Sequence, residues 1–268
     1  MAAAVTSNAN PHAALPGPRA LGLALLALVL AAAALLPLFQ FTDLDRRLAD
    51  SMFDAAARRF PWREHWFAAR FMHNGVKLGL IAIAVVLWGV LLLDAVRPLK
   101  RLAPPRRLHL RIVAACSVLV PLVVSLWKRY SALHCPWDLE PYGGSAPYLR
   151  LLDALPAGLA PGGCFPAGHT TGALWLAAFA VLWWPRRPGL AALVFTAGLG
   201  AGFGLGWVQQ MRGAHFLSHT LWSVWASCAV IWAVLCIARA MSGGGTASVP
   251  QGVNVPGNTQ SSAAVIVR

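Results

Sequence analysis

Six stretches of this chain are apolar over about the length that crosses a lipid bilayer, which restricts the possible folds severely. Hydrophobic residues make up 58% of its 268 residues and charged residues only 12%, a balance typical of membrane proteins. Because a backbone in lipid must satisfy its hydrogen bonds internally, such stretches form helices. The sequence therefore predicts an all-α, polytopic membrane protein with about six transmembrane helices in a bundle. The spans are expected at residues 20–41, 76–93, 110–127, 170–184, 189–207 and 216–237.

The expected bundle divides the chain into one domain and two tails. Residues 20–240 form a single membrane-embedded domain, whereas residues 1–19 and 241–268 have no long apolar pattern and are expected to be disordered. Between the first two spans, residues 42–75 mix acidic and basic side chains with apolar ones at helical spacing. This pattern predicts an amphipathic helix at the membrane interface, broken at Pro61.

The positive charge of the chain, +13 in total, gathers in loops that share one side of the predicted bundle. Arg186 and Arg187 separate the fourth and fifth spans, and Arg239 follows the sixth. The cations between the second and third spans are Arg97, Lys100, Arg101, Arg106, Arg107 and Arg111. By the positive-inside rule these loops face the cytoplasm. We expect a bacterial inner membrane protein with both termini in the cytoplasm, loops 128–168 and 209–215 facing the periplasm, and no nucleic-acid partner.

Three predicted helix ends on that outer side carry histidines or cations. Residues 165–170 (Phe-Pro-Ala-Gly-His-Thr) lead from a polar loop into an apolar helix, whose first turn offers free N–H groups and a positive dipole end. There His169 can exchange protons with a bound anion. Arg212 and His215 precede a second helix, and Lys128 closes a third. Together these ends predict one phosphate site.

Two of the five cysteines, Cys135 and Cys164, lie in the outer loop beside these helix ends. In an oxidising compartment they can form a disulfide. Closing a loop of about 30 residues would stabilise the fold by roughly 3–4 kcal/mol in the chain-entropy model. Two free thiols are the alternative. The other three cysteines lie within predicted spans, as small apolar residues do.

The three helix ends resemble the motifs of the type-2 phosphatidic acid phosphatase superfamily, which also contains the vanadium haloperoxidases. Residues 166–169 (Pro-Ala-Gly-His) resemble its P-S-G-H motif. Lys128 with Cys135 and Pro136 resembles the first motif, K-x6-R-P. Residues 213–219 resemble the third motif, R-x5-H-x3-D. The resemblance implies a phosphatase-like domain with its site elements in residues 128–219, on the outer side of six helices.

The resemblance also implies a mechanism. His215 attacks phosphorus and forms a phosphohistidine, and His169 protonates the leaving alcohol and then activates water. Lys128, Arg212 and the amide of Gly168 hold the phosphate oxygens. The substrate is a lipid phosphate within the membrane, and no metal or other cofactor is needed.

This chain departs from the family motifs at four positions. Cys135 and Gln209 stand where the family has arginine, His219 where it has aspartate, and Ala167 where it has serine. Arg212 can supply the charge that Gln209 lacks. Arg129 or His134 can contact the phosphate in place of the arginine that Cys135 replaces. Asp138 is the nearest loop carboxylate that can supply the negative charge missing at His219. His219 follows His215 by four residues, so it shares a helix face and can orient His215, but without a negative charge.

Several alternatives remain open from the sequence. Arg212 and His219 also fit the third motif if one residue is inserted. Phosphoryl transfer to a second lipid would use the same phosphohistidine. Because motif residues are lost, a protein that binds a lipid phosphate without cleaving it is a further alternative. A helical histidine pair also has the spacing of metal ligands. That metal site would draw on His215, His219, His134, Cys135, Cys164 and His169.

Overall fold

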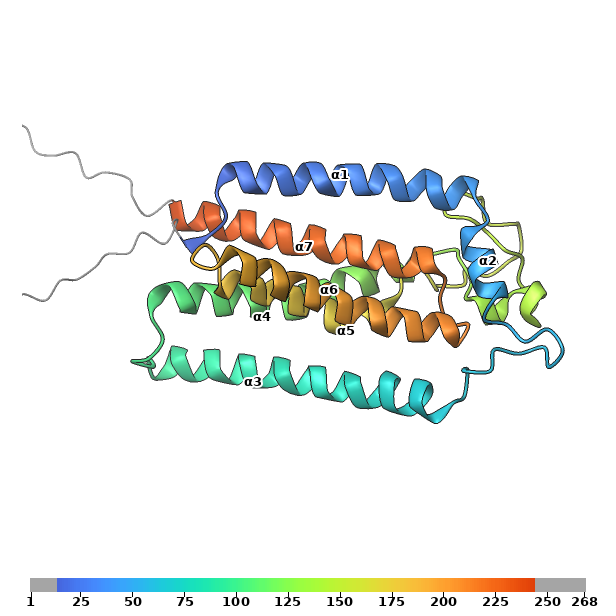
Figure 1. Ribbon diagram of the computed structural model, residues 1–268, viewed down its shortest axis with the longest axis horizontal. Helices are drawn as coiled ribbons and strands as arrows, with labels where there is room; N and C mark the ends of the chain where they lie inside the picture. The colour runs from blue at the N-terminus through green and yellow to red at the C-terminus, as the bar shows by residue number, and fades with distance from the viewer. Residues whose placement is uncertain (1–13, 244–268) are drawn as a thin grey trace, which may run out of the picture.

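The computed structural model describes residues 14–243, and within them the chain is helical with no β-strand, which confirms the all-α fold class (Figure 1). Most of the two predicted tails lies outside these described residues. The helices are α1 (Pro18–Phe41), α2 (Leu44–Asp50), α3 (Val76–Val96), α4 (Pro104–Arg129), α5 (Thr171–Leu174), α6 (Pro188–Met211) and α7 (Leu217–Gly243).

Five of the described helices are long and apolar enough to cross a membrane, as expected for an integral membrane protein: α1, α4, α6, α7, and α3 together with the π-helical turn Phe67–Gly75 that precedes it. The fourth predicted span is a shorter apolar helix, Gly168–Leu182. In it α5 lies between two 3₁₀ segments, Gly168–Thr170 and Trp175–Leu182. Because a 3₁₀ helix rises about 2 Å per residue instead of 1.5 Å, this segment reaches further than its length suggests.

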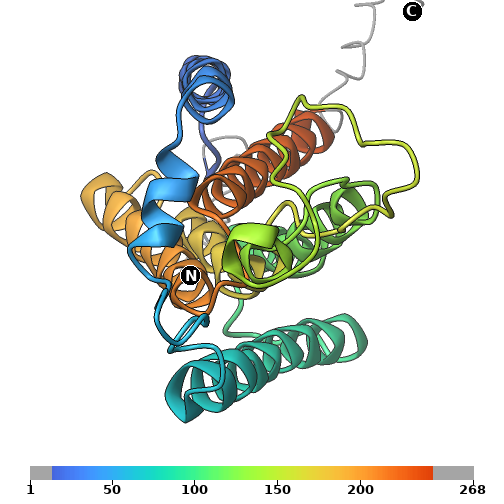
Figure 2. The same cartoon turned by 90° about the vertical axis from the view of Figure 1, so that its right-hand side faces the viewer.

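The short helix lies at the centre of the bundle, where α4, α6 and α7 surround it (Figure 2). Its side chains are accordingly among the most buried, including Leu174, Trp175 and Ala177. Helices α1 and α3 lie on opposite sides of this group, α1 against α7 and α3 against α4. Both outer helices expose large apolar side chains, as helices that contact lipid do.

Glycines let α6 approach the central helix closely. Gly198, Gly202 and Gly206 recur every four residues and therefore share one face of α6. A Cβ atom at Gly198 would lie 2.4 Å from the backbone nitrogen of Ala177, and one at Gly202 would lie 2.3 Å from Leu174. Small residues at such contacts are the usual means of packing helices in membranes. The contact also fixes the end of α6, where part of the site lies.

We expect Gly198→Ala to lower the thermal unfolding temperature of the protein in detergent. Its methyl group would collide with backbone, which cannot turn away as a side chain can, and overpacking of this kind typically costs about 1–3 kcal/mol. Gly200→Ala is the matched control, since a Cβ at Gly200 meets nothing within 4 Å. Equal unfolding temperatures for the two variants would contradict the close approach.

The segment between the first two spans differs from the predicted amphipathic helix. Within it only α2 and the π-helical turn Phe67–Gly75 are helical, and the α-helix resumes at Val76. Met52 and Phe53 instead pack on a buried apolar cluster that includes Phe60, Tyr142 and Phe216. This long-range contact replaces the local helical pattern, and it holds α2 over the end of the bundle that carries the three motifs (Figure 1).

Candidate active site

Backbone hydrogen bonds join the three motifs at one end of the bundle. The Ala167 N–H donates to the carbonyl of His219 at 3.1 Å, which ties the second motif to the third. The Ser223 hydroxyl donates to the Ala167 carbonyl at 3.0 Å and reinforces this link. The Trp137 N–H donates to the carbonyl of Gly213 at 3.0 Å and ties the first motif loop to the third. The motifs predicted from the sequence therefore share one site.

The predicted disulfide between Cys135 and Cys164 is present, with Cα atoms 5.3 Å apart. It crosslinks the first motif loop to a position two residues before the second motif. The sulfur of Cys164 lies 3.4 Å from Nδ1 of His215, so the crosslink also packs against the third motif. Because the two sulfurs are bonded to each other, neither is a thiolate, the form in which cysteine binds a metal.

His215 and His219 form a buried pair beside His169. The Nδ1 atoms of His215 and His219 lie 3.4 Å apart, and the two side chains belong to residues only 3% and 1% exposed. The ring centroids of His169 and His215 are 6.4 Å apart, close enough for one phosphoryl group to reach both. If Nδ1 of His215 carries the proton and donates to His219, then Nε2 of His215 keeps its lone pair.

Burial lowers the pKa of His215 well below its usual 6.5, and electrostatic interactions with His219, Lys128 and His169 act in the same direction. The imidazole of His215 is therefore neutral at neutral pH. A neutral imidazole is the form that can act as a nucleophile.

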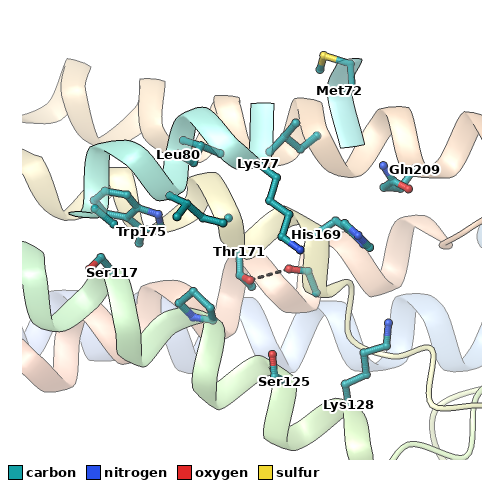
Figure 3. A pocket seen from close by; sticks show the side chains of 16 residues that line it. Met72, Lys77, Leu80, Ser117, Ser125, Lys128, His169, Thr171, Trp175 and Gln209 are labelled. Atoms are coloured by element: carbon teal, nitrogen blue, oxygen red, sulfur yellow. Dashed lines mark hydrogen bonds between the residues drawn. The ribbon is translucent and has the colours of Figure 1, made fainter. Parts of the chain in front are cut away.

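A cavity of about 470 Å³ lies beside this pair, between α3, α4, the central helix and α6 (Figure 3). At one end it is lined by Lys128, Gly168, His169 and Gln209. The remaining wall is mainly apolar, with residues that include Leu80, Ile81, Ala84, Pro121, Trp175 and Leu205. Of the three histidines, His169 lines the cavity, whereas His215 and His219 are not among the lining residues.

Arg212 lies next to the cavity without lining it. Its Nη1 donates to Oε1 of Gln209 at 2.9 Å, and its Nε donates to the carbonyl of Arg63 at 3.1 Å. Gln209 is buried and lines the cavity, so it stands between the guanidinium and the cavity. Gly213 follows with φ +72°, and a Cβ there would lie 2.3 Å from the ring of Phe60. This turn therefore requires glycine.

Three other residues predicted for the site lie away from the cavity. Arg129 and Asp138 are exposed. His134 uses Nε2 to contact the carbonyl of Ala160 at 3.1 Å, a hydrogen bond within the loop. None of the three lines the cavity beside His169.

Two residues near the site were not predicted from the sequence. Lys77, near the start of α3, lines the cavity and extends into it (Figure 3). Asp45, in α2, is only 5% exposed and accepts a hydrogen bond from the Ser218 N–H at 2.9 Å, at the first turn of α7. Burial raises the pKa of the Asp45 carboxyl to about 6. The only sequence signal for Lys77 is that it is a cation at the outer end of an apolar span. Asp45 is one of many charged residues in its segment, so nothing in the sequence distinguishes it.

Comparison with protein-family models matches residues 109–241 to the model described as the PAP2 superfamily. Comparison with curated proteins and with solved structures gives no match. The matched region begins within α4 and ends within α7, so it contains all three motifs. It leaves out α1, α2 and α3, and with them Lys77 and Asp45.

Proposed function

Residues 109–241 make this chain a member of the PAP2 superfamily, and from that membership we propose that it is an integral membrane phosphatase acting on a lipid phosphomonoester or diphosphate. The observation that carries the proposal is the neutral, buried His215 with its ring 6.4 Å from His169, at the end of a cavity that also holds Lys128. A nucleophile, an acid–base group and a cation are the parts that metal-independent phosphoryl transfer needs.

In the first step, Nε2 of His215 attacks phosphorus, an N–P bond forms and the bond from phosphorus to the lipid oxygen breaks. The leaving alkoxide takes a proton from His169. In the second step, His169 removes a proton from water, the water oxygen attacks phosphorus, and the N–P bond breaks to release phosphate. Lys128 and the N–H groups at Gly168 stabilise charge on the non-bridging oxygens, and Lys77 offers a further cation.

The apolar wall of the cavity supports a lipid as the substrate. Leu80 and Ile81 of α3, and Pro121 of α4, belong to helices that are long enough to cross the membrane. A phosphate held by Lys128 would therefore leave its alkyl chain against apolar side chains, which a small soluble phosphate would not need. Transfer to a second lipid alcohol in place of water is the alternative reaction on the same phosphohistidine.

The burial of His215 favours one rival, a protein that binds lipid phosphate without cleaving it. Phosphate release by purified protein from a panel of lipid phosphates separates the two. We expect the wild-type protein to release phosphate. For Lys128→Met we expect a roughly tenfold to hundredfold higher KM, because removal of a charge-assisted contact lowers the affinity for the substrate by about this factor. Lys100→Met, in the loop between α3 and α4, is the control and should leave KM unchanged. Binding of these lipids with no release would overturn the phosphatase proposal.

The charge distribution supports an orientation with the site on the periplasmic side and both termini in the cytoplasm. Cysteine labelling from outside tests it in a background that replaces the free cysteines Cys116, Cys228 and Cys236. Leu152→Cys, at an exposed position in the loop that joins α4 to the central helix (the motif loop), should react with an impermeant maleimide. Arg106→Cys should react only after lysis. The reverse pattern would invert the topology.

A further inference from the structure

A second, much smaller cavity lies against His219. Its volume is about 10 Å³, roughly the space that the centre of one water molecule needs. Its polar lining comes from α2, the motif loop and α7: Asp45, Tyr148, Arg150, Ser218, His219 and Trp222. The cavity therefore joins α2, which lies outside the matched family region, to the third motif.

The groups around this cavity can hold a water molecule. Trp222 is only 7% exposed, and among the described residues its indole N–H has no hydrogen-bond partner. The buried Nε of Arg150 likewise has none within residues 14–243. Buried donors of this kind are normally satisfied by protein or by ordered water. Asp45 supplies acceptors, since the donors of Ser218 and Leu217 occupy only part of its carboxylate.

The histidine pair needs a negative charge that its own motif does not contain. When His215 attacks phosphorus its ring becomes positive, in a site that is buried and already holds Lys128. Its neighbour at 3.4 Å is the imidazole of His219, which carries no negative charge. Nδ1 of His219 is the ring nitrogen that lies 3.4 Å from His215. Nε2 is the ring nitrogen that remains for a group in the small cavity, which His219 lines.

The other carboxylates described near this end have different partners or surroundings. Asp43 pairs with Arg150 at 2.8 Å, and Asp50 accepts from the hydroxyl of Tyr142 at 2.7 Å. Asp138 is exposed. Asp45 is the buried carboxylate that shares a cavity with His219.

We propose that Asp45 is a positioning residue for the third motif, connected to His219 through one water molecule in this cavity. The water accepts the Nε2–H of His219 and donates to the Asp45 carboxylate. Nδ1 of His219 then accepts the Nδ1–H of His215, which leaves Nε2 of His215 for phosphorus. The carboxylate from α2 thus supplies, two hydrogen bonds away, the charge that His219 lacks. The proposal rests on the proposed phosphatase function.

The test compares Asp45→Asn in two backgrounds, wild type and His219→Asp. The amide of asparagine can still accept the Ser218 N–H, so the contact at the start of α7 is kept while the charge is removed. In the wild-type background we expect kcat to fall by roughly tenfold to hundredfold with KM unchanged, the usual effect of an outer residue that orients a histidine. In the His219→Asp background the carboxylate is already beside His215, so Asp45→Asn should change kcat by less than about threefold. Asp50→Asn, on the same helix, is the matched control and should leave kcat unchanged in both.

A second measurement does not depend on turnover. In protein labelled with ¹⁵N-histidine, NMR shifts report which ring nitrogen of His215 carries the proton, with His215→Ala used to assign its signal. We expect the Nδ1–H tautomer in the wild type and a mixture in Asp45→Asn.

Equal losses of kcat in both backgrounds, or an unchanged tautomer in Asp45→Asn, would overturn the role of Asp45 and leave the phosphatase function standing. A changed tautomer in a protein that releases no phosphate would support the Asp45 link and overturn the phosphatase function instead.

Discussion

His215→Ala is expected to abolish turnover, because it removes the group proposed to form the covalent intermediate. His215 is the histidine whose ring lies 6.4 Å from His169, whereas His219 is enclosed by the rings of Phe165 and Phe216. Removing a nucleophile leaves only the binding contribution to catalysis, so the loss should be at least as large as that of any other single substitution. The measurement is phosphate release together with acid quenching and detection of phosphate on the protein.

His219→Ala is the comparison that decides which histidine is the nucleophile. It should still form the phosphohistidine, more slowly, since it removes only the partner of His215 Nδ1. Phosphate retained on the chain after His215→Ala but lost after His219→Ala would show that His219 is the nucleophile, as in the alternative alignment of the third motif with Arg212. Both variants should be compared with wild type in thermal unfolding, because both histidines are buried.

His169→Ala should slow hydrolysis of an alkyl phosphate by roughly a hundredfold or more, the range typical of a lost general acid. His169 lines the cavity, so it would face the oxygen of a lipid phosphate bound there. Nitrophenyl phosphate should be affected much less in its first step, since nitrophenolate leaves without a proton. The measurement is the ratio of single-turnover rates of dephosphorylation for the two substrates.

His65→Ala is the control for the loss of a histidine on the same side of the protein, because His65 is exposed and lies against Trp62 rather than in the cavity. It should leave both rates unchanged. An equal loss for alkyl and nitrophenyl substrates in His169→Ala would mean that His169 holds the phosphate but does not protonate the leaving group.

Local sequence patterns were sufficient for the membrane class, the positions of the helices and the three motifs. Apolar length predicts a span because each residue experiences lipid directly. The disulfide between Cys135 and Cys164 was also predictable, since both residues border motifs that must meet. The central helix, Gly168–Leu182, was predicted as an ordinary span, because its 3₁₀ segments depend on how α6 packs against it.

The sequence by itself determined an all-α membrane protein in which Lys128, His169 and His215 come from three helix ends on one side. Only the tertiary structure decided which of the other polar residues accompany them: it brings Lys77 and Asp45 to the site and leaves Arg129, His134 and Asp138 outside the cavity. The physical reason is that motif spacing is local, whereas the approach of α2 and α3 depends on side-chain packing between segments far apart in the chain. A buried carboxylate such as Asp45 has no periodic pattern to reveal it, since its burial comes from α7 and the motif loop rather than from its own helix.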